Sequence, residues 1–72
     1  MNVVKKFVIV TKDGSKVQLT FDINLTTREA ELMRIDMERP LNKNELKAVE
    51  KIIEHIKEKV KEEGVRVYAG ES

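Results

Sequence analysis

The 72-residue chain has no cysteine and no tryptophan, and it contains only three glycines and one proline. Without cysteine, a disulfide framework and thiol chemistry are excluded. The glycines at 14, 64 and 70 are too far apart to build a dinucleotide-binding loop or a P-loop. The longest unbroken apolar run covers residues 7–10, which is too short for a membrane span or for the core of a signal peptide. We therefore expect a cytoplasmic protein.

Charged residues make up 38% of the chain, and the net charge is only +1. Such a balance is typical of ion-paired surfaces in thermostable proteins and of engineered chains. It argues against a general nucleic-acid binder, which would carry a basic excess. Hydrophobic residues reach 40%, enough for one small core, so we expect a single α+β domain over residues 1–72.

Residues 41–64 form the clearest periodic segment and predict one long amphipathic helix. Asn42 and Glu45 have the spacing of a capping box, and Gly64 is a typical C-terminal stop. The apolar stripe of this helix consists of Leu46, Val49, Ile52, Ile53, Ile56 and Val60. Its apolar spacing also fits a coiled coil, but packing on a sheet of the same domain is the interpretation we favour, because the stripe is wide.

Residues 3–11 and 16–23 predict a β-hairpin around the turn signal Asp13-Gly14. A three-residue loop with a bulge would pair Phe7 with Leu19, whereas a two-residue loop would pair Val8 with Leu19. We favour the bulged loop because it places Phe7 on the apolar face. In either register residues 7–10 leave apolar side chains on both faces of the first strand, and the surplus needs a cover.

Residues 26–38 predict a shorter helix, with a capping box from Thr26 and Glu29 and an end before Pro40. The competing interpretation is a strand, because Met33, Ile35 and Met37 alternate with charged residues. As a helix, the segment would carry Leu32 and Ile35 on a second apolar side.

Residues 65–69 alternate and predict a third strand. The expected architecture is therefore ββααβ, a three-stranded, mostly antiparallel sheet made of the hairpin and the C-terminal strand, packed on two helices of which the second is long. The expected core consists of Phe7, Ile9, Val17, Leu19, Phe21, Met33, Leu46, Val49, Ile53, Ile56, Val60 and Val67.

No group of residues indicates catalysis. Ser15 lies in a turn and Ser72 ends the chain, so neither is a candidate nucleophile. His55, the only histidine, has Glu58 and Glu62 on the same helix, but we interpret it as an exposed residue because this pattern is no specific metal signature. We expect no enzyme activity, cofactor, metal, membrane contact or small-molecule substrate.

Two blocks of the sequence, 25–40 and 55–70, resemble the first helix and the recognition helix with wing of winged-helix domains in bacterial response regulators. The resemblance implies that Lys51, His55, Lys57 and Lys59 lie near a DNA groove, with Arg66 on the wing. In that family a second helix and a turn separate the two blocks, whereas residues 41–54 here are continuous with the final helix.

The functional hypothesis is a non-enzymatic protein–protein interaction module, a homodimer or a binder of another protein. It would use the surplus apolar surface formed by Val8, Val10, Leu32 and Ile35. The alternative is a small winged-helix-like DNA-binding regulator. Its expected nucleic-acid contacts are Lys5, Lys6, Lys12, Lys16, Lys51, Lys59 and Arg66.

Overall fold

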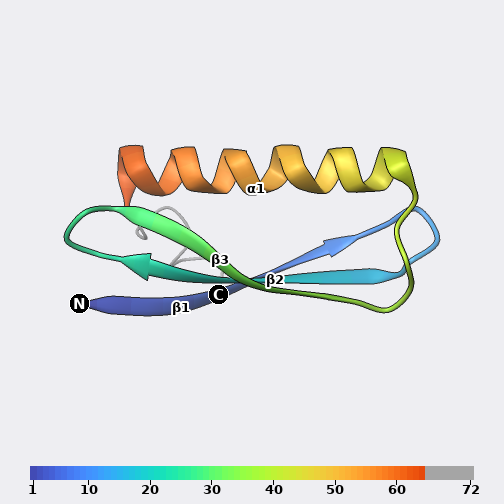
Figure 1. Cartoon of the computed structure of the whole chain (residues 1–72), viewed down its shortest axis with the longest axis horizontal. Coiled ribbons are helices and arrows are strands. Elements are labelled where there is room, and N and C mark those ends of the chain that lie inside the picture. The colour runs from blue at the N-terminus through green and yellow to red at the C-terminus, as the bar shows by residue number, and fades with distance from the viewer. Residues whose placement is uncertain (65–72) are drawn as a thin grey trace.

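A computed structural model describes residues 1–64 of the chain. It contains three strands followed by one helix, in the order β1 (Asn2–Val10), β2 (Lys16–Asn24), β3 (Glu29–Met37) and α1 (Lys43–Glu63). The strands form an antiparallel sheet in the order β1-β2-β3, with α1 along one face (Figure 1). No helix or strand within residues 1–64 covers the other face, which is called the open face below. The α+β class is as expected, but the predicted ββααβ order is wrong. The predicted strand 65–69 lies outside the described residues.

The core lies between β2 and α1. Every β2 side chain that points towards the helix is fully buried, and the largest, Phe21, meets the ring of Phe7 edge-on at 5.7 Å between centroids. The buried side chains are Val17, Leu19, Phe21, Ile23, Val49, Ile53, Ile56 and Val60. Met33 and Leu46 are exposed and were wrongly predicted as core, whereas Ile23 was missing from the prediction. Val67 lies outside residues 1–64.

The turn between β1 and β2 has the predicted three-residue loop. Thr11 N donates to Ser15 O at 2.9 Å, and Gly14 adopts φ +86°, a conformation that glycine reaches without steric cost. Phe7 consequently pairs with Leu19, so the bulged register favoured from the sequence is confirmed. This register directs Phe7 to the helix side of the sheet and Val8 to the open side.

Residues 26–38 form a hairpin turn and β3, so the predicted helix and its Thr26 capping box are wrong. Asn24 Oδ1 accepts hydrogen bonds from the backbone N–H groups of Thr26 and Thr27, which gives this segment a local alternative to a helical turn. β3 then pairs along the free side of β2, and this tertiary pairing overrides the helix propensity of its residues. The same strand replaces the first helix that the winged-helix resemblance implied.

A β-bulge interrupts β3 at Met33. Thr20 pairs with Arg34 and Phe21 pairs with Leu32, so Met33 has no residue opposite it in β2. The bulge changes the phase of the strand, which lets Leu32 and Ile35 both point to the helix side although they are three residues apart.

Both predicted ends of α1 are confirmed. Asn42 Oδ1 accepts from Glu45 N at 2.8 Å, Glu45 Oε1 accepts from Asn42 N at 3.0 Å, and Gly64 N donates to Val60 O. These bonds satisfy backbone groups that a helix end leaves without intrahelical partners. No helix in residues 1–64 combines the length and apolarity needed to cross a lipid bilayer.

Candidate interaction surface

The open face of the sheet changes in character from one edge to the other. On β1 it presents Val4, Val8 and Val10, with 64%, 56% and 61% of their surface exposed, around Lys6. The open-side residues of β2 and β3 are mostly polar or charged, namely Lys16, Gln18, Thr20, Asp22, Glu29, Glu31, Arg34 and Asp36. The apolar surface of this face is therefore concentrated at the β1 edge.

Val4 belongs to this apolar row but was missing from the sequence prediction. Val4, Val8 and Val10 are separated by even numbers of residues, so in a strand they must share a face. That spacing was a usable signal once the hairpin register placed Val8 on the open side.

The outer edge of β1 has no strand partner within residues 1–64. Its nine residues pair with β2 in unbroken register, without a bulge, and its sequence contains no proline. Proteins usually protect exposed edges with bulges, prolines or charges. On β1 only Lys5 and Lys6 serve this purpose, whereas β3 has the Met33 bulge and four charged residues.

The four predicted interface residues fall on two faces of the sheet. Val8 and Val10 are exposed on the open side, but Leu32 and Ile35 point to the helix side from β3. Leu32 is half-buried against the core, and Ile35 is 38% exposed. The structure therefore brings only Val8 and Val10 together, and it adds Val4 to them.

The basic residues predicted to contact nucleic acid are dispersed. Lys6 and Lys16 lie on the open face, and Lys5 lies on the opposite face of the same sheet. Lys12 is in the first hairpin turn, Lys51 is on the solvent side of α1, and Lys59 is within 4.0 Å of Glu62 and Glu63. Arg66 lies outside the described residues. DNA binding stays a prediction, without a common basic surface to support it.

A shallow hollow of about 620 Å³ lies on the open face of the sheet. Its two carboxylates are engaged, because Asp36 accepts from Arg34 Nε at 2.9 Å and Glu38 accepts from Lys16 N at 2.6 Å. His55 lies in a shallow charged depression on the solvent side of α1. Among residues 1–64, no cluster of histidine and acidic side chains could hold a metal ion.

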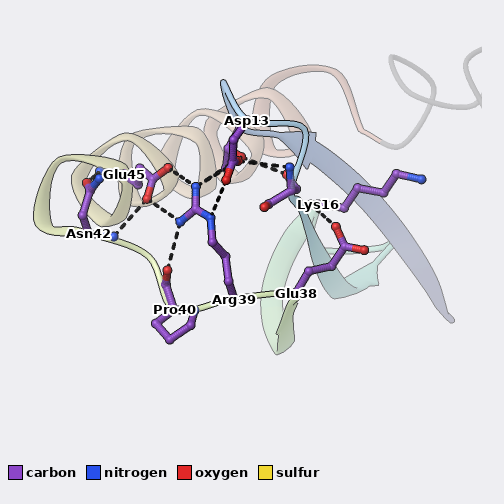
Figure 2. Close-up of polar contacts among 9 residues, drawn as sticks. Asp13, Lys16, Glu38, Arg39, Pro40, Asn42 and Glu45 are labelled. Carbon is purple, nitrogen blue, oxygen red and sulfur yellow. Dashed lines mark hydrogen bonds and ion pairs between the residues drawn. The ribbon is translucent and has the colours of Figure 1, made fainter.

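Arg39 joins three segments at one end of the molecule, a role that its position before Pro40 did not reveal (Figure 2). Its Nε and Nη2 donate to the two carboxylate oxygens of Asp13 at 2.9 and 3.0 Å. Its Nη1 and Nη2 donate to both oxygens of Glu45 at 2.9 and 2.7 Å. Paired N–H groups of this kind match carboxylate geometry closely. The first hairpin turn, the loop after β3 and the start of α1 are thereby connected.

This network predicts a specific loss of stability in acid. Hydrogen bonds from Arg39 and from Asn42 N lower the pKa of Glu45 from 4.5 to about 2, and Arg39 holds the pKa of Asp13 well below its usual range. Because the folded-state pKa values are depressed, the stabilisation is complete above pH 4.5 and is lost as the pH falls towards 2. We expect Arg39→Gln to lower the melting temperature at pH 7. Between pH 5 and pH 2, the melting temperature of this variant should fall less steeply than that of the unaltered chain.

Arg34→Gln is the matched control for that measurement, because within the described part of the chain Arg34 pairs only with Asp36 on the same strand, and its side chain is 72% exposed. Thermal denaturation of both variants and of the unaltered chain across this pH range gives the comparison. Parallel curves for Arg39→Gln and the unaltered chain would contradict the assignment.

A comparison with protein-family models gives no match. Comparisons with curated proteins and with solved structures give none either.

Proposed function

We propose that the chain is a non-enzymatic protein–protein interaction module that works as a homodimer through β1. The observation that carries this proposal is that β1 combines an exposed row of valines with an outer edge that has no strand partner within residues 1–64. Contiguous exposed apolar surface is typical of association sites, and an unpaired edge offers backbone hydrogen bonds to a second strand.

The size of the domain supports the same conclusion. One helix covers a three-stranded sheet only in part, and Val3, Phe7 and Ile9 on the helix side of β1 remain half-buried. A chain of 72 residues has a small core, so additional burial at an interface contributes strongly to its stability. A second copy placed against β1 would add cover to these side chains as well as to the exposed valines.

Sedimentation equilibrium on the full chain tests the proposal. We expect a reversible monomer–dimer equilibrium with a dissociation constant roughly in the micromolar range, since a strand-edge contact is a small interface. Val8→Lys should weaken dimerisation about tenfold or more, because it replaces exposed apolar surface by a charge next to Lys6.

Thr20→Lys is the matched control, since it adds the same charge on the open face but on the central strand. It should leave the dissociation constant close to that of the unaltered chain. A monomer at several hundred micromolar, or equal weakening by both substitutions, would contradict the proposal.

A further inference from the structure

The hydrogen-bonding pattern of the first hairpin determines which backbone groups of β1 point to the outer edge and can pair with another strand. Met1 O accepts from Leu25 N, and Thr11 N donates to Ser15 O, so odd-numbered residues bond to β2 at both ends of the ladder. Hydrogen-bonded and non-hydrogen-bonded pairs alternate in an antiparallel ladder. The N–H and C=O groups that point to the outer edge therefore belong to Asn2, Val4, Lys6, Val8 and Val10.

From this hydrogen-bonding pattern we propose a specific dimer, in which β1 pairs antiparallel with β1 of a second copy about a twofold axis through Phe7. The inference rests on the proposed function and defines its geometry. An axis perpendicular to the sheet keeps both helices on one side and places odd residues opposite odd ones. The result is a continuous six-stranded sheet in which Phe7 faces Phe7 of the second copy.

The two lysines of β1 discriminate between the available registers. An axis through Lys5 or through Lys6 would place that lysine directly opposite its own copy, and like charges opposite each other destabilise a strand pair. An axis through Val8 avoids this conflict but shortens the paired segment to residues 6–10. The axis through Phe7 pairs residues 4–10 and places no lysine opposite another lysine.

This register is also favourable on each face of the sheet. On the open side Lys6 lies opposite Val8 of the second copy, and Val4 lies opposite Val10, which joins the two valine rows. On the helix side, Phe7 of each copy occupies a non-hydrogen-bonded position, where opposing side chains come closest. Phe7, which is half-buried and packs edge-on against Phe21, would there lie against the same aromatic ring of the second copy.

A second copy at β1 is favoured over a contact between β1 and β3. Pairing β1 with itself closes the assembly at two chains, whereas pairing β1 with β3 of another copy would leave free edges and allow continued growth. In addition, the Met33 bulge and the charges of β3 disfavour regular pairing along that edge.

Site-specific crosslinking tests the register. Because the chain has no native cysteine, every disulfide that forms must join introduced cysteines. Lys6→Cys and Val8→Cys both alter exposed open-face positions, so the fold of each variant should be retained. The two variants, distinguished by mass labelling, are mixed and oxidised. We expect the mixed Lys6→Cys/Val8→Cys disulfide to dominate over either self-disulfide by several fold, because hydrogen-bonded pairs have a Cα separation suited to a disulfide.

Each other outcome overturns the inference in a distinguishable way. Dominant self-crosslinking of Lys6→Cys would place the axis at Lys6, and that of Val8→Cys would place it at Val8. If sedimentation shows a dimer but neither variant crosslinks above the Thr20→Cys control, edge pairing is excluded while the proposed function stands. If sedimentation shows only a monomer, both the proposed register and the proposed homodimer are wrong. Protection of the outward-pointing β1 amides from hydrogen exchange in that monomer would then show that another part of the same chain pairs with this edge.

Discussion

Phe21→Ala is expected to destabilise the protein by about 3–5 kcal/mol, the usual loss for truncating a fully buried aromatic side chain. Phe21 is the largest buried residue, lies on the central strand, and contacts Phe7 edge-on. A domain of this size has a total stability of only roughly 4–10 kcal/mol, so this loss removes a large share of it. Chemical denaturation followed by circular dichroism would measure the change.

Phe7→Ala provides the matched control, because it removes the same ring from the partly exposed edge strand. At protein concentrations below the dissociation constant of the dimer, its cost should be clearly smaller than that of Phe21→Ala. Equal costs would contradict the assignment of the core to the space between β2 and α1.

Ile56→Ala is expected to cost about 2–5 kcal/mol, whereas Leu46→Ala should cost about 1 kcal/mol or less. Ile56 is 4% exposed and belongs to the buried row that α1 presents to the sheet, while Leu46 is 43% exposed. Truncating Ile56 leaves a cavity that the surrounding side chains fill only in part. Truncating Leu46 removes apolar surface that is already largely in contact with water.

Urea denaturation of both variants measures the two losses in the free energy of unfolding. Both substitutions introduce alanine into α1, so the helix propensity of the new residue is the same in each. It also separates two positions that helical periodicity alone had placed together in the core. Leu46 precedes Val49 by three residues, which turns its side chain by about 60° relative to that of Val49 and places it at the margin of the buried row. A loss for Leu46→Ala as large as that for Ile56→Ala would show that the helix packs on the sheet in a different rotation.

The elements predicted correctly from the sequence are those whose determinants are local. α1 carries its own capping box, its stop and a periodic stripe within residues 41–64, and the first hairpin carries its turn residues. The Phe7–Leu19 register followed from the requirement that Phe7 should lie on the apolar face. No distant segment was needed for these inferences.

β3 was mispredicted because its conformation is decided by a distant part of the chain. Its residues favour a helix, and the strand forms because β2 offers a second edge for pairing. A usable signal was nevertheless present. Apolar residues stand at 30 and 32 and again at 35 and 37, so the even-numbered alternation changes to an odd-numbered one. This change is expected for a strand with one extra residue between the two pairs. The valine row of β1 was found in part, because its members become one surface only once the open face is known.

The Met33 bulge also bears on how the length of this chain can change over evolution. β3 contains one residue more than the ladder requires, and a chain without Met33 would keep Arg34 opposite Thr20 and Leu32 opposite Phe21. β2 has no such spare residue, so a deletion there would turn part of its buried row towards the open face. Relatives of this protein should therefore tolerate a change of length in β3, while the length of the central strand is conserved.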